Sequence, residues 1–197
     1  MATRHPALSH DAVTLLMDDH SRVKRLFDEF RKIHLAGTSS ALPGMADMLA
    51  RKRDIVEKTC VELTLHMYVE EVIFHPEARK ILNDEALMNE IEVQHTALRD
   101  LIDQIDEGDV DDPMICAMFM VLGQYADHNA KEEEREMFPI VRASSLDLDA
   151  LGERMMTRRE WLEREIGIDG PESQVPAAVM ANAQRSWWDR IADFARG

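Results

Sequence analysis

The sequence predicts an all-α protein, an up-down-up-down four-helix bundle with additional C-terminal helices. Apolar residues recur at three- and four-residue spacing through most of the chain, and no sustained apolar–polar alternation of a strand is present. Breaker clusters at 37–44, 83–84 and 108–113 divide these periodic segments. Because the connections are short, consecutive helices should pack in antiparallel order.

The first two predicted helices lie on either side of segment 37–44. Ser9 or Asp11 can cap the first helix, since a short polar side chain accepts a hydrogen bond from the first turn. The second helix is predicted over 45–82. Pro76 should kink or end it, because proline has no amide hydrogen to donate.

The remaining helices have their own start signals. Asn83-Asp84 forms a turn and a suitable N-cap for a third helix over 85–106. Pro113 suits the first turn of a fourth helix, which should run to about position 141. A shorter fifth helix is predicted over 147–166.

The chain divides into a domain and a tail. Residues 1–166 should form the bundle with its short fifth helix, and residues 167–197 a linker followed by an amphipathic helix over 177–195 that includes Trp187 and Trp188. We expect this helix to dock on the bundle or on another subunit, which would give a homo-oligomer. Binding to a membrane surface or recruitment as cargo to a larger assembly are the alternatives.

Composition excludes several classes of function. The formal net charge of −15 at pH 7 disfavours non-specific nucleic-acid binding, which needs a cationic face. No run approaches the ~18 apolar residues of a membrane span, and the N-terminus does not resemble a signal peptide, so we expect a cytoplasmic protein. Cys60 and Cys116 fall within apolar helical patterns and are interpreted as buried reduced thiols, with a disulfide or reactive thiol as the alternatives.

The most informative feature is a pattern that occurs twice. His66 precedes Glu70 by four positions, and His128 precedes Glu132 by four positions. A histidine and a carboxylate at i and i+4 share one face of an α-helix. Two such helices facing each other would bring two imidazoles and two carboxylates together, which is the ligand set of a paired-metal site.

Two further histidines extend the pattern. His20 and His95 each begin a His-x-x-apolar-x-x-apolar-apolar segment, so in each half a helix with one such histidine precedes a His-x-x-x-Glu helix. One histidine on an apolar face is usually a hydrogen-bonded core residue. Buried ionised carboxylates need a partner, however, and no lysine or arginine has the phase to neutralise both Glu70 and Glu132. We therefore expect these six side chains to hold two cations.

The donor types narrow the choice of metal. Imidazole and carboxylate ligands without a thiolate suit iron, manganese or zinc. Two bridging carboxylates favour ions roughly 3.5–4 Å apart. We expect two Fe ions, with Mn or Zn as less favoured choices.

The chain resembles the hemerythrin family, in particular bacterial hemerythrin-like proteins with the HHE cation-binding domain. The resemblance covers roughly residues 10–165 and rests on Asp19-His20, His66-x-x-x-Glu70-Glu71-x-x-Phe74-x-Pro76, Glu92-Val-Gln-His95 and His128-x-x-x-Glu132-Glu133 with Met137-Phe138-Pro139. It implies a four-helix bundle with a non-haem di-iron centre, its ions joined by an oxo or hydroxo bridge. The implied ligands are His20 and His66 on one iron, His95 and His128 on the other, and Glu70 and Glu132 bridging.

The chain departs from the oxygen-carrying members of that family. Those members place two histidines one turn apart on the third helix, whereas Ile91 and Arg99 flank His95 here. Six protein ligands are therefore expected, two histidines per iron, with a position open on each. Glu62 and Tyr125 are candidates for an extra ligand or for a hydrogen bond that orients a ligand imidazole.

Three neighbours of these residues are expected to lie outside the site. At about 100° per residue, His75 lies about 180° around the helix from His66, so it is interpreted as structural or exposed. Glu71 and Glu133 directly follow the predicted bridging glutamates and should point about 100° away, toward salt bridges or ligand imidazoles.

The sequence leaves three functions open. The leading one is a di-iron protein that binds or reacts with dioxygen, nitric oxide or hydrogen peroxide, either as a carrier or as a peroxide-decomposing enzyme linked to oxidative stress. The second is an iron-binding, storage or sensing module without turnover. The third is an interaction protein recruited through its C-terminal helix, which the buried carboxylates disfavour.

Overall fold

A computed structural model describes residues 11–37 and 45–167. These residues form helices joined by short connections, with no strand among them. The elements are α1 (Ala12–Gly37), α2 (Met45–Val69), the π-helical turn η1 (Glu70–Phe74), α3 (His75–Leu82), α4 (Glu85–Asp106), α5 (Pro113–Glu132), the π-helical turn η2 (Glu133–Met137), α6 (Phe138–Arg142) and α7 (Leu148–Glu165).

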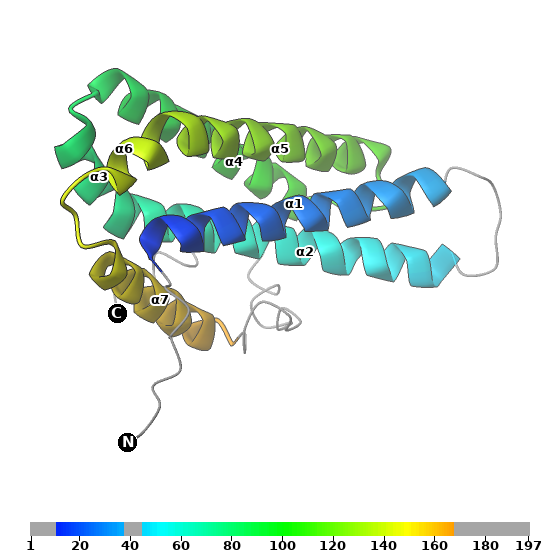
Figure 1. Cartoon of the computed structure of the whole chain (residues 1–197). Helices are drawn as coiled ribbons and strands as arrows, with labels where there is room; N and C mark the ends of the chain where they lie inside the picture. The colour runs from blue at the N-terminus through cyan, green and yellow to red at the C-terminus, as the bar shows by residue number, and fades with distance from the viewer. Residues whose placement is uncertain (1–10, 38–44, 168–197) are drawn as a thin grey trace.

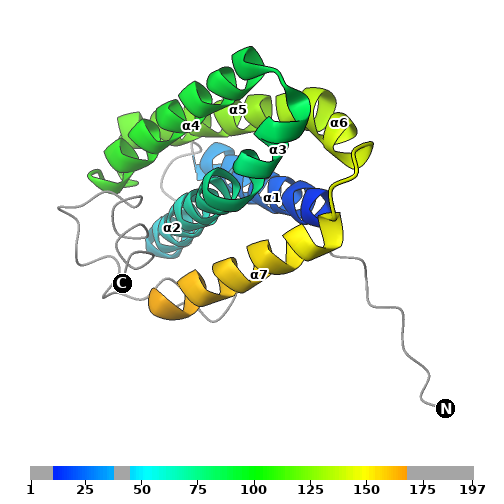
Figure 2. The same ribbon diagram turned by 90° about the vertical axis from the view of Figure 1, so that its left-hand side faces the viewer.

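The predicted four-helix bundle is confirmed. Helix α1 contacts α2, α2 contacts α4, α4 contacts α5, and α5 returns to α1, so the four long helices enclose one interior (Figure 1). Helix α7 lies outside this arrangement and packs across α1 and α2 (Figure 2). The additional helix therefore covers the side of the bundle formed by the N-terminal pair.

Aspartate side chains cap four of the helices. Each accepts a hydrogen bond from a backbone N–H in the first turn, which satisfies a donor that the helix itself leaves unpaired. The pairs are Asp11 with Thr14, Asp84 with Leu87, Asp112 with Met114, and Asp147 with Ala150. The predicted caps at Asp11 and Asp84, and Pro113 at the start of α5, are confirmed.

Two π-helical turns accommodate the prolines in the middle of long helical segments. In η1 the N–H of His75 donates to the carbonyl of Glu70, and in η2 the N–H of Phe138 donates to the carbonyl of Glu133. Each turn holds one residue more than an α-helical turn and ends two positions before a proline. Pro76 therefore starts a new α-helical segment without ending the helical path, because the first turn of a helix does not need its amide hydrogen.

The core consists of two apolar clusters separated by a polar layer. On α1, Leu16 belongs to one cluster and Val23 to the other, and His20 lies between them; α4 repeats this order around His95. We call them the Phe119 cluster, which includes Phe27, Phe30, Leu98 and Phe119, and the Phe74 cluster, which includes Leu16, Phe74, Ile91 and Phe138. Apolar packing therefore seals the polar layer at both ends.

Several other expectations can be placed. Cys60 and Cys116 are buried and form no disulfide, as expected. Within the described ranges, no helix is both long and apolar enough to cross a membrane. Some expectations fall outside the described residues. They are the cap at Ser9, most of the breaker cluster over 37–44, and the linker with its helix over 177–195.

We predict that Phe119→Ala destabilises the bundle by about 3–5 kcal/mol, because Phe119 is fully buried against Phe27 and Phe30. Urea unfolding measures the change. Met114→Ala on the same helix is the control: Met114 is 63% exposed, and its loss should change stability by no more than about 0.5 kcal/mol. Equal effects of the two substitutions would contradict the described core.

Candidate metal centre

Six side chains converge in the polar layer between the two apolar clusters. They form two groups that could hold a metal ion, and within each group the candidate ligand atoms lie within 4.8 Å of one another. The first group contains His20, His66, Glu70 and Glu133, and the second contains Glu70, His75, His95 and Glu133. Both glutamates belong to both groups, so each group pairs the same two carboxylates with two histidines of its own.

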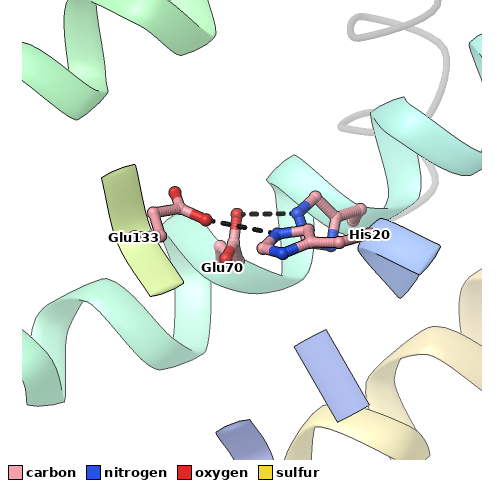
Figure 3. Close-up of side chains that lie close together, drawn as sticks. His20, Glu70 and Glu133 are labelled. Carbon is pink, nitrogen blue, oxygen red and sulfur yellow. Dashed lines mark ion pairs between the residues drawn. The ribbon is translucent and has the colours of Figure 1, made fainter. Parts of the chain in front are cut away.

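The first group joins α1 and α2 to the two π-helical turns. His20 Nε2 lies 3.3 Å from Glu133 Oε2, and His66 Nε2 lies 3.2 Å from Glu70 Oε2. The side chains of His20, Glu70 and Glu133 point toward one another (Figure 3). The ring of His20 also stacks on Phe138, with 5.8 Å between ring centroids, which fixes its plane.

The second group lies on the α3 and α4 side. His95 Nε2 lies 3.5 Å from Glu70 Oε2 and 3.7 Å from Glu133 Oε1, so this imidazole faces both carboxylates. The ring centroid of His75 lies 5.3 Å from that of His95. His75 Nε2 is buried without a hydrogen-bond partner.

Three of the histidines are held from behind by outer carboxylates. His20 Nδ1 lies 2.9 Å from Glu134 Oε1, and His95 Nδ1 lies 3.0 Å from Glu71 Oε1. His66 Nδ1 lies 3.4 Å from Asp19 Oδ2, within ion-pair distance but in a geometry that forms no hydrogen bond. A carboxylate bonded to one ring nitrogen, as in the Glu134–His20 and Glu71–His95 pairs, keeps the proton there and leaves the other nitrogen free to bind a metal. All three Nε2 atoms face the shared glutamates, as that arrangement requires.

Two buried carboxylates at the centre have only histidines as ion-pair partners among the described residues. Glu70 and Glu133 are fully buried, and in the described part of the chain neither forms an ion pair with a lysine or arginine. Burial and the nearby charge of Glu133 raise the pKa of Glu70 well above its usual range. Such a group is stable in a low-dielectric interior only if a cation or protons neutralise it.

Unsatisfied polar atoms point to a cation. Both oxygens of Glu70 lack a hydrogen-bond partner, as do one oxygen of Glu133 and the Nε2 atoms of His20 and His95. Buried polar atoms are normally paired, and a cluster of lone-pair donors aimed at one point is the arrangement that a metal ion satisfies. The donor set therefore fits two cations that share Glu70 and Glu133.

The histidines differ in their protonation. Burial lowers the pKa of His75 to about 4, and burial also lowers that of His66 despite the nearby Asp19 carboxylate. For His20 and His95 burial acts in the same direction, but the carboxylates around them, Glu133 above all, outweigh it and raise the pKa. A cation between the imidazoles and Glu133 would replace these protons, because a metal-bound nitrogen must be unprotonated.

The structure does not bring His128 and Glu132 into this centre. His128 is exposed on α5, and Glu132 accepts a hydrogen bond from Gln94 Nε2. Asn129 and Glu133 hold the inward positions instead, which corrects the predicted register by one residue. The physical reason is the apolar phase of α5, in which buried residues recur at three- and four-residue steps: Phe119, Leu122, Ala126, Asn129 and Glu133.

His75 also differs from its expected position. The nine residues from His66 to His75 would place the two side chains on opposite sides of a regular α-helix, at about 100° per residue. The extra residue of η1 reduces the rotation between His66 and the residues after the turn by about one such step. The side chain of His75 then lies about 80° around the helix from that of His66. His75 is therefore turned into the bundle, where only 9% of it is exposed.

The two His-x-x-x-Glu patterns lie 62 residues apart, but a repeat distance of 63 residues aligns the equivalent positions of the two halves. It aligns Glu70 with Glu133 and Pro76 with Pro139, and it places the two π-helical turns in register. On this alignment Asn129 corresponds to His66. Helix α5 therefore lacks the imidazole that α2 has at His66, and His75 on α3 provides a fourth histidine instead. The equal spacing from Glu70 to Pro76 and from Glu133 to Pro139 is the sequence signal that could have identified Glu133.

The two other candidates do not reach the centre. Tyr125 is 50% exposed. Glu62 is buried, but it pairs with Arg22 at 2.9 Å and with Arg159. Arg159 also donates to Asp19 Oδ2 at 2.9 Å, so Glu62 belongs to a network that supports the carboxylate behind His66.

A cavity of about 380 Å³ reaches the centre from the His20 and His66 side. It lies between α1 and α5, and His20 and His66 line its inner end together with Asn129. Neither His75 nor His95 lines it. The two halves of the centre therefore differ in access, and the His20 and His66 half is the one that a molecule entering through this cavity would meet.

Comparison with known families agrees with this geometry. The family model described as the hemerythrin HHE cation binding domain matches residues 11–141, more than half of the chain. The match contains the four bundle helices and both π-helical turns, and it ends before α7. No curated protein and no solved structure gives a significant match.

We predict that Arg159→Gln lowers the affinity for divalent metal about 10- to 100-fold, because it removes the anchor of the carboxylate that orients His66. Competition with a metal-binding dye measures the affinity. Arg154→Gln on the same helix is the control, since Arg154 is largely exposed and lies away from the centre. Asp19→Asn breaks the same link directly, and unchanged affinity in both Arg159→Gln and Asp19→Asn would contradict the assigned role.

We predict a pH-dependent contribution of Asp19 to the stability of the metal-free protein. Burial opposes its ionisation, but Arg159 and His66 outweigh it and hold the pKa of Asp19 well below its usual range. A depressed pKa in the folded state contributes stability above the unfolded value of ~3.9, and this contribution is lost as the pH falls toward the folded value. The difference in unfolding free energy between the parent and Asp19→Asn should therefore shrink between about pH 5 and pH 2 in urea titrations. A difference that stays constant would contradict the ion pair.

Proposed function

Because the chain belongs to the hemerythrin HHE cation-binding domain family, we propose that it is a non-haem di-iron protein that binds or reacts with a small oxidant or gas. Dioxygen, nitric oxide and hydrogen peroxide are the candidate ligands. The observation that carries this proposal is the sharing of Glu70 and Glu133 by two pairs of histidines. One buried ion would leave one histidine pair without a partner, whereas two ions would engage all six side chains.

The proposed ligands revise the sequence-based set at two positions. We propose that His20 and His66 hold one ion, that His75 and His95 hold the other, and that Glu70 and Glu133 bridge them. Glu133 replaces Glu132, and His75 replaces His128. Support comes from burial: His75 and Glu133 lie inside the polar layer, whereas His128 is exposed.

Iron is the metal that we propose for this donor set. Nitrogen and carboxylate oxygen donors without a thiolate suit iron, and manganese or zinc remain the less favoured choices. A bound iron pair would supply two-electron redox chemistry and a Lewis-acidic position for an oxygen- or nitrogen-containing ligand. The two apolar clusters would keep bulk water from the remaining sides of the centre.

Access favours a reactive centre over a purely storage site. The cavity between α1 and α5 ends at His20 and His66, so an external molecule could reach that half. Asn129 lines the same end and donates from Nδ2 to Glu133 Oε1 at 3.2 Å, which fixes one bridging carboxylate while leaving the cavity open. A sensor would need the same entrance for its ligand, and rapid decomposition of hydrogen peroxide by the iron-loaded protein would distinguish the enzyme from it.

We predict that Glu133→Gln and His75→Phe each abolish binding of the iron proposed to lie beside His75 and His95. Glu132→Gln and His128→Gln should leave the binding of this iron intact. The first pair of substitutions removes proposed ligands. The second pair changes Glu132 and His128, which belong to the sequence-based set but do not face the centre. Phenylalanine is a suitable replacement because Phe138 holds the equivalent position before Pro139. Iron content per chain, measured by emission spectrometry on folded samples, is the readout.

Two results would contradict the proposal. If Glu132→Gln loses iron while Glu133→Gln retains two ions, the ligand register is that of the sequence-based set. If the parent holds no iron after expression with ample iron and after reconstitution, the chain is not a di-iron protein. Circular dichroism of each variant excludes loss of fold as the cause.

A further inference from the structure

We propose that the cavity between α1 and α5 is a binding site for a small uncharged organic molecule with an apolar body and one hydroxyl or hydroperoxyl end. The polar end would lie beside His20 and His66, and the apolar body would extend toward the outside between the two helices. The assignment of this molecule as a ligand of the metal centre rests on the proposed function. The existence of the binding site depends only on the cavity.

Size is the first argument. The cavity has a volume of about 380 Å³. A water molecule occupies roughly 30 Å³, and an apolar protein cavity of about 150 Å³ already holds benzene. A diatomic gas or hydrogen peroxide would leave most of the space unfilled, whereas small-molecule sites begin at roughly 300 Å³.

The character of the walls is the second argument. The inner surface is built mainly from buried apolar side chains of four different helices: Val23, Phe27, Leu63, Met67, Leu98 and Ala126. An entrance for water or peroxide alone would not need such a surface. Gly123 contributes to the shape, since a Cβ atom there would lie 2.8 Å from Phe27 Cδ1 and would displace that ring.

Charge is the third argument. The charged side chains at the rim of the cavity form ion pairs with one another. Lys131 Nζ lies 2.5 Å from Asp127, which Lys24 Nζ also approaches to 4.0 Å, and Arg31 pairs with Asp28 at 3.0 Å. Glu134 also lines the cavity and pairs with His20. An uncharged ligand would leave all of these pairs intact.

Linear alcohols are suitable unreactive probes of this site. Isothermal titration calorimetry of the full-length, metal-loaded protein with butanol, pentanol and hexanol should give affinities that rise by about fourfold per added CH₂, because each buried methylene contributes ~0.8 kcal/mol. Metal content is measured on the same samples.

Filling the cavity provides the decisive variants. Ala126→Leu and Ala130→Leu each place extra carbons in the cavity and should weaken hexanol binding at least about tenfold while metal content stays at the parent level. Ala117→Leu is the matched control, because Ala117 is exposed on the same helix and does not line the cavity. Two filling variants are used so that failure of one to fold does not decide the result.

The outcomes separate the two proposals. Affinity without dependence on chain length, or equal binding by Ala117→Leu and both filling variants, would overturn the organic-ligand site while leaving the metal centre in place. Chain-length-dependent binding that the filling variants abolish, in protein that holds no metal, would support the site and overturn the proposed di-iron function instead.

Discussion

The burial of two carboxylates between four imidazoles is the constraint on which the rest of this structure depends. Glu70 and Glu133 lie at the centre of the bundle, and no lysine or arginine among the described residues neutralises them. Ions shared by both groups would satisfy the free lone pairs of the carboxylates and the Nε2 atoms of the histidines together. The apolar clusters on either side exclude water that would otherwise solvate the carboxylates and the ions separately, which strengthens the attraction between them.

The two halves of the centre are built differently. His66 is supported by Asp19, which two arginines hold, and one of them, Arg159, comes from α7, outside the residues that the family model matches. The cavity also opens onto this half. On the other side, Glu71 with Arg99 supports His95, and His75 has no hydrogen-bond partner for its buried Nε2. With the proposed pair of ions bound, the ion at His20 and His66 would be the one that a molecule in the cavity reaches.

The fold could be predicted from the sequence because local signals and periodicity agreed. Aspartates before helices, proline in the first turn of α5 and apolar residues at helical spacing all indicated the same bundle. The site was harder to predict, because a shift of one residue along the chain decides which glutamate faces the centre. The visible His128-x-x-x-Glu132 pattern suggested an inward face, whereas the apolar phase of α5 selects Glu133. His75 could not be placed by counting from His66, because the π-helical turn between them adds a residue that a regular 3.6-residue period does not include.

The π-helical turns connect the sequence repeat to the centre. Each begins at a shared glutamate and ends two positions before a proline, so the same local structure positions both carboxylates. Anomalous diffraction at the iron edge from iron-loaded crystals tests this account most directly. It predicts two peaks, each in contact with Glu70 and Glu133, one beside His20 and His66 and the other beside His75 and His95. A single peak, or peaks outside the polar layer, would contradict the central claim.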